Sequence, residues 1–164
     1  MGSEMCIRDS PPDGEIRING APLLDVIREA ELPSATAEYD ERTANGETGI
    51  YNLAGEYLYM PPSMYFLPNR NLLDEPYSLA AIGFAIPEND PQSQKATILQ
   101  CTCGVPDCWF LMTHITLEQN VVRWSAFEQF HRDWKYNLSF NFDRTDYESP
   151  VSYTHLTLPT IHLV

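Results

Sequence analysis

The sequence predicts an α+β fold, in which an antiparallel sheet of about five or six strands carries one or two packed helices. The first observation is a meander over residues 96–127, with strand-like segments 96–103, 108–117 and 121–127 joined by short turns. The second is an amphipathic helical pattern at 22–30. The third is the aromatic content, 12% of the residues, which supplies apolar surface for a core.

Both ends of the chain resemble translated sequencing adapters rather than protein. Residues 1–10, MGSEMCIRDS, match one transposase-type adapter strand, and residues 151–160, VSYTHLTLPT, match the opposite adapter in the same frame. We therefore predict that residues 1–10 and 150–164 are not native and that residues 11–149 form a single globular domain. Because the reading frame crosses both end segments, the sequence leaves open where the native termini lie and whether a signal peptide precedes the domain.

The predicted domain is strongly acidic. Without Glu4, Arg8 and Asp9 of the end segments, it keeps 21 of the 23 acidic and 9 of the 10 basic residues, a net charge of −12. This charge repels phosphate backbones, so we expect no nucleic-acid partner but a basic protein partner, in an oligomeric state that the sequence leaves open. No apolar run approaches the ~20 residues of a membrane helix, so we expect a cytoplasmic protein.

The first part of the domain predicts a strand, a turn and a helix. Residues 15–18 alternate between polar and apolar side chains, and Asn19-Gly20 is a turn signal. In the segment 22–30, apolar side chains recur at helical spacing after a proline in the first turn. We expect Pro33 to end this helix.

The middle of the domain shows weaker patterns. Residues 39–49 are polar and contain Asn45-Gly46, so we expect a surface loop. Residues 50–59 predict a strand or an edge segment, and residues 77–86 predict an apolar strand between two prolines. A further loop is expected at 88–94.

The later elements follow from alternation and capping. Segment 108–117 is apolar on both of its faces, so we expect a central strand that is covered on both sides. The turn before it is predicted at 104–107. Residues 140–143 predict a last strand, followed by a helix with Asp143 as its cap and Asp146 at the capping-box position.

Three cysteines gather around the first turn of the meander. Cys101 and Cys103 leave the same face of a strand, and Cys108 lies across the turn from Cys103. We expect packed thiols without a cofactor, and zinc is the alternative. Zinc would need a fourth ligand, either the local Asp107 or a His131 that folds back. A third reading is a disulfide between Cys103 and Cys108 in an oxidising compartment.

The segment after the meander concentrates aromatic and cationic side chains. We expect a buried aromatic corner in which the polar groups satisfy backbone carbonyls or Glu128. The alternative is a pocket rim formed by Trp124, with His131 and Arg132 as anchors for an anion.

A combination of motifs across the domain resembles a family of uncharacterised bacterial proteins. The motifs are Cys101-x-Cys-Gly-x-x-x-Cys-Trp109, Val122-x-Trp-x-x-Phe-x-Gln-x-His-Arg132, Trp134-x-Tyr136, Phe140-x-Phe-Asp143, Tyr147 and the opening Ile16-x-Ile-Asn-Gly-x-Pro-Leu23. The chain departs from the family at Phe110 and Phe130, where the family carries proline, and the departures concern local turn geometry. The family has no established activity, so the resemblance implies no function.

The sequence contains none of the common catalytic motifs that bind phosphate, present a nucleophilic serine or hold a catalytic zinc. We therefore predict a small acidic protein-interaction module, immunity- or adaptor-like, rather than an enzyme. Its acidic face would bind a basic partner. The alternatives are a zinc- or thiol-dependent protein that uses Cys101, Cys103 and Cys108, and a ligand-binding or hydrolytic pocket near Trp124, His131 and Arg132.

Overall fold

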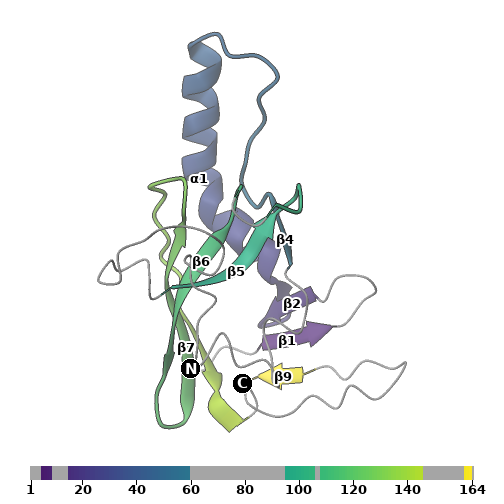
Figure 1. Ribbon diagram of the computed structural model, residues 1–164, viewed down its shortest axis with the longest axis vertical. Coiled ribbons are helices and arrows are strands. Elements are labelled where there is room, and N and C mark those ends of the chain that lie inside the picture. Colours follow the sequence, from purple (N-terminus) through teal and green to yellow (C-terminus); the bar gives the residue numbers. More distant parts are fainter. Residues whose placement is uncertain (1–4, 9–14, 60–94, 106–107, 146–160, 164) are drawn as a thin grey trace.

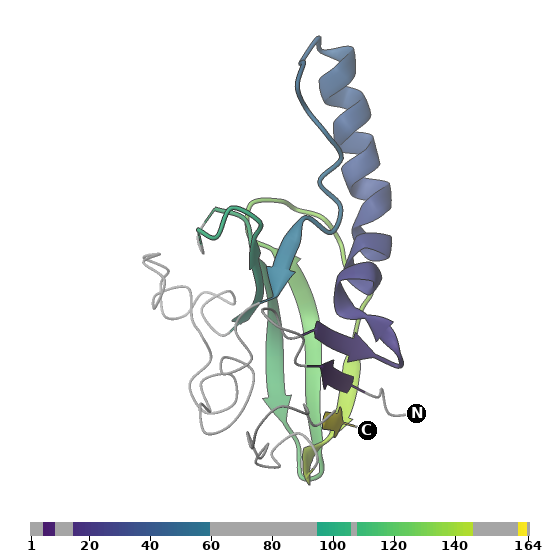
Figure 2. The ribbon, with the colours of Figure 1, turned by 90° about the vertical axis from the view of Figure 1, so that its right-hand side faces the viewer.

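The predicted α+β class is confirmed by the computed structural model, in which one long helix, α1 (Leu23–Ala44), packs against a curled five-stranded antiparallel sheet. The sheet forms a half-barrel, and a second, small sheet lies beside the lower end of the helix (Figures 1 and 2). The structure describes residues 5–8, 15–59, 95–105, 108–145 and 161–163.

The large sheet has the strand order β4-β5-β6-β7-β8, and all neighbouring strands are antiparallel. Its strands are β4 (Tyr57–Tyr59), β5 (Ala96–Cys101), β6 (Leu111–Leu117), β7 (Val121–Gln129) and β8 (Phe140–Asp143). The predicted meander is therefore confirmed. Strand β6 is the central strand, and Leu111, Met112 and Thr113 are fully buried on successive positions, as the covered faces predict.

The strands at the first turn are shorter than predicted. Strand β5 ends at Cys101 and β6 begins at Leu111, so Cys103 and residues 108–110 belong to the connection. Backbone hydrogen bonds within the connection, from Gly104 N–H to the Cys101 carbonyl and from Cys108 N–H to the Val105 carbonyl, replace ladder bonds there. The local turn thus takes residues that alternation alone assigns to strands.

Two register shifts bend the sheet. On β5, Ile98 lies between the pairs Thr97↔Met112 and Leu99↔Leu111. On β7, Ala126 and Phe127 stand opposite the single residue Thr113, and Ala126 has φ +51°. Such bulges add local twist and curl to a sheet. The β7 bulge also re-aims the strand just before the 130–139 segment, which is important for the cavity described below.

The small sheet has the order β3-β2-β1-β9. The predicted N-terminal strand is confirmed as β2 (Glu15–Ile18), and the Asn19-Gly20 turn joins it to β3 (Ala21–Pro22) with positive φ at both turn residues. Both predicted end segments contribute strands, β1 (Met5–Arg8) and β9 (Ile161–Leu163), and β1 pairs with β2 on one side and β9 on the other. This pairing does not test the adapter origin, which stays a prediction.

The predicted end of the helix at Pro33 is wrong. Helix α1 continues through Pro33 for three more turns to Ala44. The predicted loop at 39–49 is wrong over residues 39–44 and correct at Asn45-Gly46, where the turn follows the helix. Contacts from other elements hold the helix on both sides of the proline: Gly55 N–H and Tyr57 Oη bond to Glu31, and Arg132 bonds to Glu38. These tertiary contacts outweigh the local cost of proline in a helix.

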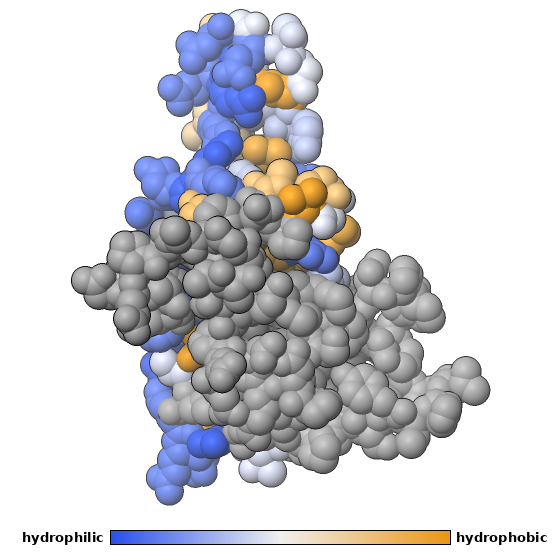
Figure 3. All heavy atoms as spheres, viewed as in Figure 1, coloured by the Kyte–Doolittle hydropathy of each residue, from blue (hydrophilic) through white to orange (hydrophobic). Residues whose placement is uncertain are grey.

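The far half of α1 projects beyond the sheet, and residues 45–56 return alongside it (Figure 2). On the face shown in Figure 3, this projecting part is largely hydrophilic, with apolar side chains between the hydrophilic ones. Strand β4 is shorter than the predicted segment 50–59. The predicted strand 77–86 and loop 88–94 lie outside the described residues. Of the helix predicted after Asp143, only residues 144 and 145 are described.

The core lies between the sheet and the near half of α1. The largest fully buried side chains in this core are Trp124, Phe142, Ile16, Leu23, Ile27 and Ile98. Trp124 packs edge-on against Phe142 across the β7–β8 pair at a centroid distance of 5.4 Å. The described residues contain no helix that is long and apolar enough to cross a membrane.

Candidate metal centre and adjoining cavity

The turn after β5 brings the three predicted cysteine sulfurs together. Cys101 is buried at the end of β5, whereas Cys103 and Cys108 are exposed in the connection. Gly104, with φ +78°, reverses the chain, and the Cys103 N–H points at the Cys101 Sγ at 3.4 Å. As a result, the three Sγ atoms all lie within 4.8 Å of one another. All three cysteines are free thiols.

The cluster polarises its own thiols. The Cys101 thiol and the Val105 amide donate hydrogen bonds to the Cys103 sulfur and lower the pKa of Cys103, because they stabilise its thiolate. The sulfurs of Cys101 and Cys103 raise the pKa of Cys108 to about 11. Without a cation, one thiolate therefore opposes the formation of a second. A bound cation would reverse this, because a coordinated thiol loses its proton.

His131, which the sequence offers as a further ligand, does not join the cluster, and neither does His114. His114 lies on β6 opposite Ser125, and His131 lies beyond β7, where its ring packs edge-on against Phe110 and Phe130. Among the described residues, the group of candidate ligands contains the three cysteines. Asp107, the predicted local ligand, lies outside the described residues.

Trp109 connects the cysteine turn to the rest of the molecule. Its ring stacks on Tyr57 at 6.2 Å and meets Trp134 edge-on at 5.7 Å. The Arg132 guanidinium lies over the same ring, 5.1 Å from its centroid, and bonds in a bidentate manner to Glu38 of α1 at 2.8 and 3.0 Å. Cys108 is thus adjacent in sequence to a side chain that packs against both the sheet and the 130–139 segment.

A buried carboxylate of α1, Glu31, was not predicted from the sequence. Glu31 of α1 is 1% exposed and accepts hydrogen bonds from Gly55 N–H at 2.7 Å, Tyr57 Oη at 2.6 Å and Tyr136 Oη at 2.5 Å. The close approach of residue 55 needs glycine, because a Cβ there would lie 2.7 Å from the Arg28 Cβ. One signal was available: the buried stripe Leu23, Ile27, Glu31, Ala35 places a single carboxylate among apolar residues at four-residue spacing.

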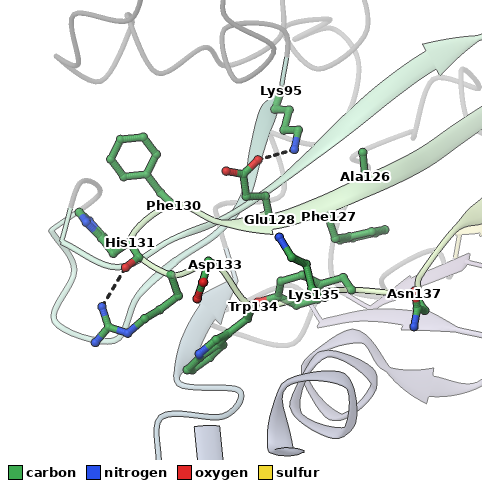
Figure 4. A pocket seen from close by; sticks show the side chains of 12 residues that line it. Lys95, Ala126, Phe127, Glu128, Phe130, His131, Asp133, Trp134, Lys135 and Asn137 are labelled. Atoms are coloured by element: carbon green, nitrogen blue, oxygen red, sulfur yellow. Dashed lines mark hydrogen bonds and ion pairs between the residues drawn. The ribbon is translucent and has the colours of Figure 1, made fainter. Parts of the chain in front are cut away.

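A cavity of about 890 Å³ opens beside the β7 bulge. Its lining residues are Lys95, Ala126, Phe127, Glu128, Phe130, His131, Arg132, Asp133, Trp134, Lys135, Tyr136 and Asn137 (Figure 4). Of the predicted pocket residues, the structure brings His131 and Arg132 to this cavity. Trp124 is fully buried against Phe142 and does not line it. The aromatic wall instead includes Trp134, ten residues further along the chain.

Comparisons with protein-family models, with curated proteins and with solved structures found no match for this chain. The resemblance to an uncharacterised bacterial family stays a prediction.

Proposed function

We propose that the protein is a small zinc-binding module in which Cys101, Cys103 and Cys108 hold one Zn²⁺. The observation that carries this proposal is the convergence of three sulfurs within 4.8 Å. Tetrahedral zinc with Zn–S bonds of about 2.3 Å places its sulfurs about 3.8 Å apart, so a small contraction of the turn would bring the three thiolates to bonding distance of one ion. The fourth position would be taken by water or by a further ligand. Thiolate sulfur is the ligand that zinc prefers in structural sites.

The expected role of the ion is to stabilise the fold. The three ligands lie at the end of β5 and in the connection to β6, next to Trp109, so an ion would fix the connection whose Trp109 ring packs against Tyr57 and Arg132. Metal binding energy acts as folding energy when the unfolded chain has no preformed site. Because thiols must lose protons to bind zinc, the affinity should rise with pH.

Metal analysis of the reduced protein, purified without chelator, tests the proposal. We expect one zinc per chain, lost in Cys103→Ser and in Cys108→Ser and accompanied by a lower Tm. Cys6→Ser is the matched control, because Cys6 lies on β1 and is the one cysteine outside the cluster. It should keep the zinc.

Two results would contradict the zinc proposal. One is a folded, monodisperse protein without metal that has the same Tm with and without chelator. The other is loss of two free thiols on purification without metal, which would identify a disulfide such as Cys103–Cys108 in its place. Circular dichroism of each variant separates loss of metal from loss of fold.

The surface of α1 favours a second candidate function, binding of a basic protein partner. Leu32 at the middle of α1 is 49% exposed, Tyr39 in the projecting half is 37% exposed, and Tyr51 on the returning segment is 60% exposed. Asp40 and Glu41 are exposed on the same half of the helix. A surface that combines exposed aromatic side chains with carboxylates complements a segment rich in Lys and Arg.

An oligolysine peptide carrying a fluorophore is a suitable probe for this second function. Fluorescence anisotropy should show binding that weakens steeply with salt and is lost in the double variant Asp40→Lys, Glu41→Lys. The control is Glu118→Lys, an exposed carboxylate between β6 and β7 that pairs with Arg123. Equal loss in both variants would mean that the peptide responds to net charge, and this would refute a docking surface on α1.

A further inference from the structure

We propose that the cavity beside the β7 bulge binds a small organic anion that carries a planar apolar body. The cavity shares no residue with the cysteine cluster of the proposed zinc site.

The cavity has the dimensions and walls of a small-molecule site. Its volume of about 890 Å³ falls in the range of ligand pockets. Phe127 and Trp134 are nearly buried in its wall, and Phe130 is half-buried. The Phe130 ring is held in place by stacking on Phe110 at 4.9 Å. Aromatic walls of this kind favour flat apolar groups, because such groups stack on ring faces.

The charge of the cavity is opposite to that of the protein. Three of the chain's ten Lys and Arg residues line it, together with His131, against the carboxylates Glu128 and Asp133. This concentration of cations in a protein with formal net charge −13 makes the cavity the favourable place for an anion to approach.

Lys135 is the cation available to a ligand. Lys95 is engaged by Glu128 at 2.5 Å and Arg132 is engaged by Glu38. Lys135 is exposed and forms no ion pair with any described residue. Figure 4 shows its side chain extending from the 130–139 segment toward Glu128 and the interior of the cavity. An anionic group bound there would meet the Lys135 ammonium, while Asp133 on the same segment would repel it.

The edge of the cavity is formed by a strained backbone. Ala126 lines the cavity with φ +51°, a left-handed conformation that is unfavourable for a residue with a Cβ. The β7 bulge at Ala126 and Phe127 turns Phe127 and Glu128 into the cavity wall. Strained residues and bulges are concentrated at functional sites in proteins. The strain at Ala126 is therefore an independent observation in favour of a ligand site at this wall.

Anilinonaphthalene sulfonate is the probe for the test, because it joins a planar apolar body to one anionic group. The full-length protein should bind one molecule with increased fluorescence. Lys135→Gln should weaken binding, and Asp133→Asn should strengthen it, each by about fivefold, the value of one charge at about 4 Å in water. Arg28→Gln, which removes an exposed cation from the surface of α1, is the control and should change nothing.

Two further probes define what the site recognises. Phenylnaphthylamine has the apolar body without the charge, and its binding should respond to neither Lys135→Gln nor Asp133→Asn. Inorganic phosphate should compete weakly with the sulfonate, because it lacks the apolar body. The proposal is overturned if the two substitutions shift both aromatic probes alike, if they shift neither, or if Arg28→Gln has the same effect as Lys135→Gln. Circular dichroism confirms that the variants, all at exposed positions, remain folded.

Discussion

Glu31 shows how a single side chain joins three distant parts of the chain. Its carboxylate bonds to Tyr57, 26 residues away, and to Tyr136, 105 residues away. Burial raises the pKa of Glu31, and burial together with the Glu31 charge raises the pKa of Tyr57 and of Tyr136. Both hydroxyls therefore stay protonated and act as donors, so the carboxylate is satisfied although it is removed from water.

Replacement of Glu31 by Gln should change the pH dependence of stability. A carboxyl whose pKa is raised by folding stabilises the protein below its unfolded pKa of about 4.5, and this stabilisation is lost as the pH rises through the folded value. The advantage of the wild type over Glu31→Gln should therefore shrink as the pH rises from 4.5. The variant should also lose about 1–3 kcal/mol, because its amide has one acceptor oxygen in place of the two that receive three donors in the wild type.

Urea unfolding between pH 4 and pH 8 measures this difference. Glu29→Gln, at an exposed position of the same helix, is the matched control and should follow the wild-type profile. If the profiles of wild type and Glu31→Gln run parallel, Glu31 is not the group that titrates.

The difference between predicted and missed residues follows from sequence separation. The cysteines were predicted to meet because a short turn brings near neighbours together. His131 and Arg132 were named from their local density as the alternative of a pocket rim, beside the expected buried aromatic corner. Glu31 and Tyr136 could not be paired in this way, because only the packing of α1 on the sheet brings them together. Trp124 was assigned to the pocket, but the pleat of β7 directs it into the core against Phe142.

At the scale of elements, helix α1 is the main departure from the sequence prediction. Local rules end a helix at proline, because Pro33 lacks an N–H to donate to the Glu29 carbonyl and its ring crowds that carbonyl. The strands were predicted better, since alternation and turn residues are local signals that β5, β6 and β7 obey. The length of α1 is decided by contacts from β4 and the 130–139 segment. No sequence pattern within residues 22–44 indicates these contacts.

Pro33→Ala should stabilise the protein. The substitution restores a helical hydrogen bond at an exposed position, worth up to about 3 kcal/mol, and it also gives the unfolded chain more freedom, which costs about 0.4–1 kcal/mol. We expect a net gain of about 1–2 kcal/mol in urea unfolding. The control is Ala37→Ser, at another exposed position of the same half of α1. No gain in Pro33→Ala would mean that the local helix geometry at Pro33 depends on the proline.

At the scale of the whole molecule, the described residues share one core cluster, and the strands of the chain ends pair beside it. The core cluster of described side chains extends from Ile16 to Phe142 and joins α1 to the curled sheet. The chain ends meet this domain through the backbone pairing of β1 with β2 and with β9. The prediction that residues 1–10 and 150–164 are not native can therefore be tested by removing them.

A chain of residues 11–149 should fold and keep its properties. Strand β2 keeps its pairing with β3 and its buried Ile16 and Ile18, because both lie inside the trimmed chain. We expect the free energy of unfolding to fall by no more than about 1 kcal/mol, the size of a typical single substitution. Zinc content should equal that of the full chain, because all three clustered cysteines remain. A much larger loss of stability would show that β1 and β9 are integral to the fold, and the adapter interpretation would then fail on physical grounds.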